Sequence, residues 1–505
     1  MEYLIGIDIG TTNSKLRLYN RQGVVREEKI FPTPFYPDQY GGTYEPEEIA
    51  DLVVTALKAI DSSLKSSVVG LSVSSFAEVL VGLGKEGRPA LRSLAFFDKR
   101  TSEQYSRLAD RLPPAEVYRN TGLSPYHIYS LYKLRWHREA ELENFQAVAI
   151  WTSMAGYLLN FLGGELSFDY SLASRTMLFD QRKQAWDPGL LELAGAREKQ
   201  MAPLVPSGQI LGSLREGIAW QTGLPASMKL VAGGHDHLCA ALAAGVIREG
   251  QVLVSTGTTE SLTVALEALP FIEYTSLKRP FSLGHHVLSS RFYAMHGIYS
   301  GGYAIDWGVR LLGEEYSVFN ALSLPVTGGN LPLFFPYLLG ADYAGAKGAF
   351  LNLAGRTGRN ELLQGLVTGL CFEYRNLWEE VIGTLGIPVN RVINVGGASR
   401  NRYWMQLKSS LLGYELIVPR DKEGSAKGAA LLAGLGCGVY RDAEEAFRES
   451  FQEEEIYAPL PAVRDALESW YDLYRDLWED IQRINRKISV HRVENGNRYL
   501  SRKEG

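Results

Sequence analysis

Two short segments decide the fold of this chain: DIGTTNS at residues 8–14 and STGTTES at residues 255–261. Each follows an apolar run, LIGI or QVLV, and each leads into a run of alternating character, KLRLYN or SLTVAL. Alternation of this kind is typical of β-strands, so each segment is predicted to be a glycine–threonine turn between two strands. A Gly-Thr-Thr match alone could be coincidence, but the flanks match as well. The repeat therefore predicts two similar α/β domains.

Length and composition agree with this reading and exclude several classes of protein. The chain has 505 residues, more than one hydrophobic core usually serves. Its net charge of -5 provides no basic surface for nucleic acid. The three cysteines, Cys239, Cys371 and Cys437, are far apart, which argues against a disulfide framework or structural zinc. No run reaches the roughly 18 apolar residues that span a bilayer, and the acidic Glu2 is unlike a signal peptide. We expect a cytoplasmic protein that binds neither nucleic acid nor membrane.

The two predicted hairpins have the chemistry of phosphate-binding loops. Glycine lets a backbone approach a ligand closely and accepts positive φ, so successive N–H groups can face a phosphate, and threonine hydroxyls add donors. Asp8, beside the first hairpin, could hold Mg²⁺, which prefers few carboxylates and several waters. Either hairpin alone would more simply be a plain turn. Two of them in equivalent positions predict a phosphate clamp, and the absence of GxxxxGK[ST] excludes a P-loop.

A candidate catalytic residue follows the segment KLVAG. The run KLVAGGHDHLCAALAAG predicts a strand, a Gly233-Gly234 turn and then a helix of small residues that starts near Asp236. An aspartate there could be a helix N-cap. It also lies at the carboxyl end of a strand, where α/β proteins place their chemistry, and a kinase needs a carboxylate to accept the proton of a hydroxyl. His237 could contact a sugar hydroxyl or cap the helix, and the sequence leaves both open.

Two later segments complete the pattern. RVINVGGASRNRYW predicts a strand, a Gly396-Gly397 turn and a helix, and the diglycine would admit a base or ribose against the backbone. The alternative is a close helix–strand crossing without a ligand. KEGSAKGAALLAGLGCG predicts a helix of small residues that packs tightly against a neighbour and needs no cofactor to explain it.

Taken in order, these motifs resemble the FGGY carbohydrate kinases, a branch of the sugar kinase–actin–heat-shock ATPase superfamily. The resemblance rests on GIDIGTTNSK, AGGHDHLCAALAAG, STGTTES, GLVTGLCFEYRNLWEEV, VGGASRNRYWMQLKSSLLG and GSAKGAALLAGLG, and it covers about residues 3–440. It implies an α/β fold with two actin-like (ribonuclease H-like) domains and an interdomain cleft. It also implies a kinase that uses ATP and Mg²⁺ to phosphorylate a hydroxyl of a small sugar or polyol.

The resemblance assigns roles to individual residues of this chain. Asp236 is implied as the catalytic base, and Asp8 is implied in the magnesium shell. Nucleotide-binding roles are implied for Gly10, Thr11, Thr12, Asn13, Gly257, Thr258, Thr259, Gly302, Gly397 and Asn401. Sugar-binding roles are implied for Ser75, Phe76, Asp98, Arg100 and His237.

The substrate expected from the resemblance is a 6-deoxyketose. Xylulose kinases have Met-His where this chain has Ser75-Phe76, and usually Asn where it has His237. The runs VSSFAEVLV, LYKLRW and WTSMAGYLLNFLGGELSFDYSLASRTMLFD look more like L-fuculose kinases. Phe76 would offer an apolar wall to a methyl group. We therefore expect L-fuculose or a similar ketose, with D-xylulose or another pentulose as the alternative.

The C-terminal region lies mostly outside the resemblance. Its apolar residues are spaced 4-3-4-3 from Val463 to Ile488, which predicts a long amphipathic helix over 461–490. That helix either packs on the second domain or forms a homodimer contact. Residues 491–505 lack apolar periodicity and are expected to be a mobile tail. The predicted division is a sugar-binding and catalytic domain over 1–246 and a nucleotide-binding domain over 247–460.

Two other functions remain to be separated from a kinase. A superfamily ATPase without a sugar substrate would keep both hairpins but would not need Asp236 beside Gly-Gly-His. A sugar sensor without activity would be expected to lack Asp8, Asp236 or a hairpin, and all of these are present.

Overall fold

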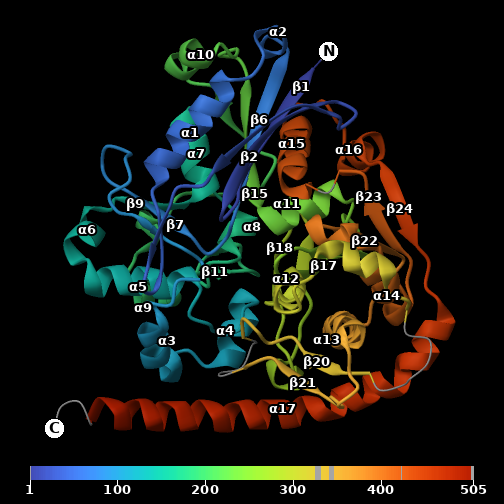
Figure 1. Ribbon diagram of the computed structural model, residues 1–505. Helices are drawn as coiled ribbons and strands as arrows, with labels where there is room; N and C mark the ends of the chain where they lie inside the picture. Colours follow the sequence, from blue (N-terminus) through green and yellow to red (C-terminus); the bar gives the residue numbers. More distant parts are fainter. Residues whose placement is uncertain (1, 325–330, 341–345, 422, 502–505) are drawn as a thin grey trace. The chain divides into compact units, whose positions relative to one another are not determined.

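The computed structural model describes residues 2–324, 331–340, 346–421 and 423–501 (Figure 1). The chain divides into two compact units. Unit 1 comprises Met1–Gln251, Thr263–Ala294 and Glu423–Gln452, and unit 2 comprises Val252–Leu262, Met295–Lys422 and Glu453–Gly505. The α/β class and the presence of two units agree with the prediction. The units are not contiguous in sequence, however, so 263–294 and 423–452 leave the predicted second domain and join the first.

Unit 1 is built on a six-stranded sheet in the order β14-β15-β6-β1-β2-β3. The strands are β1 (Tyr3–Ile9), β2 (Asn13–Asn20), β3 (Val25–Pro32), β6 (Val68–Ser75), β14 (Ile210–Ser213) and β15 (Lys229–His235). β1, β2 and β3 form the predicted antiparallel meander. β6 pairs parallel with β1 and with β15, so the carboxyl ends of these three strands meet at one edge of the sheet.

Helices of small residues pack closely on this sheet. α15 (Gly424–Gly436) lies against β1, β6 and β15 and also contacts α11 (Asp236–Ala243). A Cβ atom on Gly6 would lie 1.8 Å from the carbonyl oxygen of Ala426, and one on Gly428 would lie 1.8 Å from that of Cys239. The glycines therefore permit backbone-to-backbone packing, as predicted for this helix. Its return to the first sheet explains why 423–452 belongs to unit 1.

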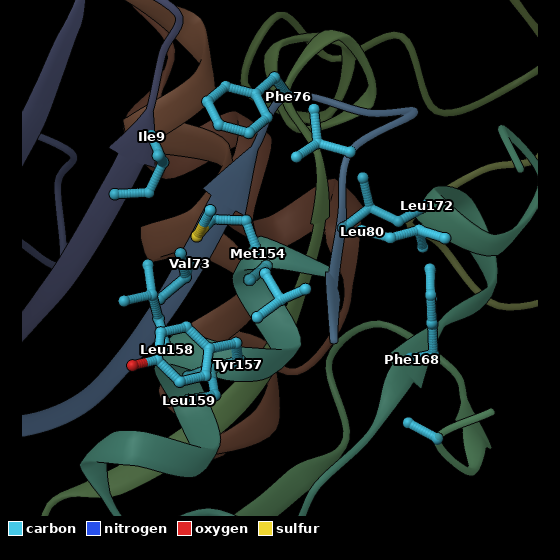
Figure 2. Close-up of a cluster of buried hydrophobic side chains, with 14 of the residues drawn as sticks. Ile9, Val73, Phe76, Leu80, Met154, Tyr157, Leu158, Leu159, Phe168 and Leu172 are labelled. Carbon is cyan, nitrogen blue, oxygen red and sulfur yellow. The ribbon is translucent and has the colours of Figure 1, made fainter. Parts of the chain in front are cut away.

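The hydrophobic core of unit 1 joins the sheet to α7 (Met154–Leu162). Figure 2 shows part of this core, in which Phe76 lies with Ile9, Val73 and Met154. The other helices of the unit are α1 (Pro46–Lys58), α2 (Ser62–Lys65), α3 (Ser102–Leu108), α4 (Pro114–Thr121), α5 (Ser130–Ala140), α6 (Leu142–Ala147), α8 (Tyr170–Ala173), α9 (Pro188–Ala194), α10 (Glu216–Thr222) and α16 (Ala443–Ser450). Small sheets are formed by β4 (Phe35–Asp38), β5 (Gly41–Tyr44) and β8 (Ser93–Leu94), by β7 (Leu80–Leu83) and β9 (Ile150–Ser153), by β10 (Phe168–Asp169) and β13 (Leu204–Val205), and by β11 (Phe179–Asp180) and β12 (Ala185–Trp186).

Unit 2 contains five neighbouring strands of a seven-stranded sheet, in the order β17-β16-β22-β23-β24, with β17 included only as far as Leu262. These strands are β16 (Gln251–Thr256), β17 (Glu260–Leu266), β22 (Arg391–Val395), β23 (Leu416–Pro419) and β24 (Glu453–Tyr457). The other strands of unit 2 are the second half of β19 (Phe292–Ile298), β20 (Leu333–Phe335) and β21 (Ala349–Leu351), and its helices are α12 (Gly301–Leu311), α13 (Arg359–Leu385), α14 (Arg402–Leu412) and α17 (Pro461–Ser501). β18 (Ser282–His285) lies in the 263–294 segment of unit 1. The second Gly-Thr-Thr turn and the adjoining parts of β16 and β17 thus lie in this unit, as the first turn lies with β1 and β2 in unit 1.

The C-terminal helix α17 (Pro461–Ser501) packs within unit 2 over its first half. Tyr474 is fully buried and donates a hydrogen bond to Glu373 of α13 at 2.9 Å, and Arg375 of α13 forms an ion pair with Glu468. This arrangement supports packing on the second unit, one of the two predicted roles. The helix continues to Ser501, so the predicted boundary at 490 is too early, and only 502–505 of the expected tail lie outside the described residues. Across the described part of the chain, no helix is long and apolar enough to cross a bilayer.

Candidate active site

Two acidic residues lie at the carboxyl edge of the unit 1 sheet. Asp8 of β1 pairs with Ser74 of β6, and Ser74 pairs in turn with Gly234 of β15. Asp236 follows β15 directly as the first residue of α11. Because β1, β6 and β15 are parallel, their ends place both carboxyl groups at one edge. Residues 228 positions apart in the sequence thus share a site.

The surroundings of Asp236 exclude the N-cap role. The N-cap of α11 is His235, and no side chain caps the helix there. The Asp236 Oδ1 atom instead accepts a hydrogen bond from the backbone N–H of His237 at 2.7 Å, and it lies 3.1 Å from Nε2 of His235. Burial would raise the pKa of Asp236, but His237 and the hydrogen bond from His235 outweigh it and lower this pKa to about 2. The carboxyl group is therefore ionised at neutral pH and able to accept a proton.

The prediction of a turn at Gly233-Gly234 is wrong, because both residues lie in the last part of β15. A Cβ atom on Gly233 would lie 1.8 Å from the carbonyl oxygen of Val73, so close strand packing explains this glycine without a ligand. The backbone next to it is held by Ser171, whose Oγ accepts a hydrogen bond from the N–H of His235 at 2.9 Å. Ser171 in turn donates to Asp169. Sequence reasoning missed these two supports because no motif links 169–171 to 235.

Asp8 has the properties expected of a magnesium-shell carboxylate. Burial and the nearby charge of Asp236 raise the pKa of Asp8 to about 7, although Ser74 donates a hydrogen bond to its Oδ1 atom at 3.1 Å. A carboxyl group that is destabilised as an anion beside a second carboxylate gains most from a divalent cation. The donor set, one carboxylate and one hydroxyl, consists of the oxygen ligands that Mg²⁺ prefers.

Asp8→Asn is expected to stabilise the metal-free fold at high pH. A raised folded-state pKa means that the stabilising contribution is present below the unfolded-state pKa of about 4 and is lost as the pH rises through about 7. Removing the carboxyl should therefore raise the Tm in magnesium-free buffer at pH 8, and the gain should shrink towards pH 4. Thermal unfolding across this pH range measures it.

Asp61→Asn is the matched control for that experiment. Hydrogen bonds from the side chain and backbone of Ser63 lower the pKa of this exposed carboxyl, so its removal should not raise the Tm at pH 8. A lower Tm for Asp8→Asn at pH 8 would show that the Asp8 carboxylate is not strained in the metal-free protein.

The first hairpin, Gly10 to Asn13, links β1 to β2 and has exposed tips. A Cβ atom on Gly10 would lie 2.6 Å from the carbonyl oxygen of Asn13, so the turn requires glycine on steric grounds. Gly10 does not adopt positive φ, contrary to the expectation for these loops. Thr33 braces the turn, because its Oγ1 donates to the carbonyl of Gly10 at 2.7 Å and its N–H to that of Thr12 at 3.0 Å. Thr12 and Asn13 are exposed, as a phosphate-contacting loop requires.

The second hairpin, Gly257 to Thr259, is held against the start of α12 in unit 2. The N–H of Gly302 donates to the carbonyl of Gly257 at 2.8 Å, and that of Tyr303 donates to Thr258 at 3.1 Å. A Cβ atom on Gly302 would lie 2.5 Å from the Gly257 oxygen, so this glycine has a packing role. Gly257 again lacks positive φ, and a Cβ atom there would meet only Thr259 oxygen at 3.7 Å.

A buried ion pair lies beneath this hairpin. Lys408 of α14 contacts the carboxylate of Glu260 and donates to Oγ1 of Thr256 at 3.0 Å. Both ionic side chains are essentially inaccessible to solvent, and Thr256 also donates to Asn394 at 3.1 Å. The pair ties both ends of the turn to a helix about 150 residues later in the chain. Sequence reasoning missed it because a lone lysine within a helical pattern is usually a solvated residue.

The two glycines of the predicted adenosine-binding segment, Gly396 and Gly397, have different surroundings. Gly396 has a φ of 97°, and a Cβ atom on it would lie 2.5 Å from the carbonyl oxygen of Thr256, so it serves packing. Gly397 has no atom within 4 Å of its Cβ position and is open to a ligand. Asn401 caps α14 by accepting a hydrogen bond from the N–H of Trp404 at 3.0 Å. Its adenosine contact stays a prediction.

Ser75 and Phe76, two of the predicted sugar-binding residues, are buried. Ser75 pairs with His235 across the β6–β15 ladder, and both Ser75 and Phe76 lie at the edge that carries Asp236. The Phe76 ring is only 4% exposed and stacks on Tyr44 at a centroid distance of 4.8 Å (Figure 2 shows it in the core). The expected apolar wall for a sugar methyl group is therefore occupied by the core of the protein.

Asp98 and Arg100 are paired with each other. Asp98 is fully buried and accepts hydrogen bonds from Arg100 at 2.8 and 2.9 Å and from the N–H of Gly42 at 2.9 Å. Arg100 also contacts Asp38 and lies over the Trp136 ring at 5.0 Å. Arg100 lines a polar pocket of about 510 Å³ in unit 1, together with Arg92 and other residues. Contact of this pair with sugar stays a prediction.

A buried Glu78–Arg175 ion pair was not predicted. Glu78 follows the Phe76 segment and adopts a φ of 60°, a strained conformation for a residue other than glycine. Its carboxylate accepts a hydrogen bond from Nε of Arg175 at 2.7 Å, and its carbonyl accepts one from Lys133 at 2.7 Å. Burial lowers the pKa of His237, and Asp236, Arg175 and Glu78 all act on it electrostatically. A charged cluster thus adjoins the predicted sugar-binding histidine.

Comparison with known proteins agrees with this arrangement over nearly the whole chain. A xylulose kinase of Bacillus subtilis (strain 168) is 26% identical, over 97% of this chain and 100% of its own length. A gluconokinase of the same organism is 24% identical, over 86% and 88%. The solved structure described as a ligand-bound xylulose kinase from Lactobacillus acidophilus shares the fold, with a TM-score of 0.88, 19% identity and coverage of 97% and 100%.

Family assignment rests on both halves of the chain. Residues 3–243 match the N-terminal domain of the FGGY family of carbohydrate kinases, and residues 252–437 match its C-terminal domain. These ranges contain Asp8, Asp236 and both hairpins in the order that the sequence motifs predicted. The chain belongs to the FGGY family of carbohydrate kinases.

Proposed function

We propose that this enzyme transfers the γ-phosphoryl group of ATP to a hydroxyl of a ketose, with D-xylulose as the leading substrate. The observation that carries the proposal is the position of Asp236, an ionised and partly exposed carboxylate at the strand end that α/β enzymes use for chemistry. The choice of sugar is supported by the xylulose kinase from Bacillus subtilis, whose entire length this chain matches.

In the proposed reaction Asp236 acts as the general base. Both of its hydrogen bonds fall on Oδ1, which leaves Oδ2 to accept the proton of the sugar hydroxyl. The hydroxyl oxygen forms a bond to the γ-phosphorus, the bond from that phosphorus to the β–γ bridging oxygen breaks, and ADP leaves. The transition state is loose, so positioning the hydroxyl contributes as much as basicity, and a base of low pKa suffices.

Asp8 and Ser74 are the residues that would hold Mg²⁺. When bound, the ion would neutralise part of the negative charge of the nucleotide phosphates. The Gly10–Asn13 and Gly257–Thr259 hairpins would donate backbone and hydroxyl hydrogen bonds to the phosphates, and the open face at Gly397 would admit the adenosine.

The sugar assignment corrects the expectation of L-fuculose. That expectation rested on runs that resemble L-fuculose kinases and on an accessible aromatic face at Phe76, but the Phe76 ring is stacked on Tyr44 inside the core. The comparisons favour the alternative, xylulose, over a 6-deoxyketose. The structural reason is simple: a side chain that is 4% exposed cannot discriminate between substrates by direct contact.

A coupled ADP-release assay tests the proposal with a panel of D-xylulose, L-fuculose, D-gluconate and glycerol. We expect the kcat/KM for D-xylulose to exceed the others by about tenfold or more, equivalent to about 1.4 kcal/mol. A preference for L-fuculose or gluconate would change the assigned substrate, but the assignment as a kinase would stand. If no sugar stimulates ADP release, the protein would instead be an ATPase of the same superfamily without a sugar substrate.

A further inference from the structure

Three successive residues at the edge of the unit 1 sheet bring together two imidazoles and a carboxylate. One ligand atom from each of His235, Asp236 and His237 lies within 4.8 Å of the other two, a grouping not found elsewhere among the described residues. Nε2 of His235 is 3.1 Å from Oδ1 of Asp236, and the two imidazole centroids are 5.3 Å apart. The His235–Asp236 separation is close to that required around a single ion, because ligands at about 2.1 Å in tetrahedral geometry are about 3.4 Å apart, whereas the other ligand atoms, within 4.8 Å, must move closer by side-chain rotation.

We propose that His235, Asp236 and His237 form a binding site for a borderline divalent transition-metal ion such as Zn²⁺, separate from the magnesium site at Asp8. Two histidines and one carboxylate with an open position form a common ligand set for zinc and related metals. Mg²⁺ prefers oxygen ligands, so it has little affinity for a site dominated by imidazoles. The two sites therefore differ in chemistry as well as in residues.

The backbone that carries the three ligands is held in place. His235 ends β15 and its N–H donates to Ser171 at 2.9 Å, while Asp236 and His237 begin α11. The carbonyl oxygen of Asp236 also accepts a hydrogen bond from Ser425 of α15 at 3.2 Å. Ligand binding then requires only side-chain rotations, and the Asp236 side chain is 27% exposed, which gives an ion access to the group.

The environment of His235 sets the expected strength of the site. Its Nδ1 atom is buried and has no hydrogen-bond partner, so once Nε2 binds an ion no acceptor would hold the ring from its other side. Metal-ligating histidines usually donate their second N–H to an acceptor, and loss of such a partner weakens metal affinity by about 10–100-fold. We therefore expect a reversible site that a chelator empties, rather than a permanent structural zinc.

Occupation of this site has a consequence that rests on the proposed function. An ion bound to the carboxylate of Asp236 would prevent that carboxylate from accepting the proton of the sugar hydroxyl. Zn²⁺ would then inhibit the kinase reaction reversibly, in proportion to its occupancy of the His235–Asp236–His237 site and at constant Mg²⁺.

Binding is tested with Co²⁺ as a spectroscopic probe, on the full chain in 5 mM Mg²⁺ without nucleotide or sugar. The expected result is a visible absorption band that saturates at one equivalent of Co²⁺ and disappears when Zn²⁺ is added. His237→Gln should weaken Co²⁺ binding at least about tenfold. Circular dichroism confirms that the variant is folded.

Two controls identify the ligands. Cys239→Ala removes the buried thiol three residues after Asp236, and His491→Gln removes an exposed histidine of α17. Neither should change Co²⁺ affinity. If the band is absent, or if His237→Gln binds Co²⁺ as well as the unmodified protein does, the proposed site is wrong, whatever the kinase activity.

The inhibition is measured separately as sugar-stimulated ADP release with increasing Zn²⁺, followed by addition of a zinc chelator. Turnover should fall as the site fills and recover on chelation. If Co²⁺ and Zn²⁺ bind as described but turnover is unaffected, the metal site stands, whereas the inhibition and the general-base role of Asp236 are both overturned. The Co²⁺ titration therefore tests the metal site, and the ADP-release assay tests the role of Asp236 in the kinase reaction.

Discussion

Replacement of Asp236 by Asn is expected to lower kcat by about 10²–10⁴, the range for loss of a general base. The amide keeps the size of the side chain but cannot take the hydroxyl proton. Nucleotide affinity should change little, because the predicted nucleotide-binding residues lie in the two hairpins and around Gly397. The measurement is ADP release at saturating sugar, with nucleotide affinity determined by calorimetry.

Asp187→Ala is the control that separates catalysis from helix capping. Asp187 is a true N-cap, because its side chain accepts hydrogen bonds from the N–H groups of Gly189 and Leu190 at 2.9 and 3.0 Å. Its loss should reduce stability by about 1 kcal/mol and leave turnover near normal. A folded Asp236→Asn variant that behaves in the same way would remove Asp236 from the mechanism.

Gly257→Val is expected to reduce nucleotide affinity by about two orders of magnitude, or about 3 kcal/mol, while sugar binding persists. A Cβ atom at this position would make only an ordinary contact at 3.7 Å, and the backbone is not in the left-handed region. The fold should therefore tolerate valine. The branched side chain would instead occupy the space that a phosphate must enter.

Gly355→Val is the matched control for this substitution. Gly355 is exposed, lacks positive φ and has no atom within 4 Å of its Cβ position. It should alter neither ATP affinity nor Tm, and calorimetric titration with ATP compares the two variants. Unchanged ATP affinity in folded Gly257→Val would mean that the second hairpin is a turn without a phosphate.

The sequence predicted the features that depend on neighbouring residues. The strand–turn–strand pattern of both hairpins, the helix of small residues at 424–436 and the amphipathic C-terminal helix were recognisable because backbone conformation follows local side-chain periodicity. The position of Asp236 after a strand was recognisable for the same reason. Its alternative role as an N-cap was a matter of local geometry that periodicity does not specify, since the N-cap and the first helical residue are adjacent in the sequence.

By itself, then, the sequence determined the family, the paired hairpins and the candidate residues Asp8 and Asp236, because these depend on short motifs in a fixed order. Only the tertiary structure decided what each side chain contacts. Phe76 is removed from the surface by Tyr44, 32 positions earlier, and Glu260 is neutralised by Lys408, 148 positions later. The reason is physical: burial and hydrogen bonding depend on the segments that the fold packs together, and spacing along one chain does not reveal them.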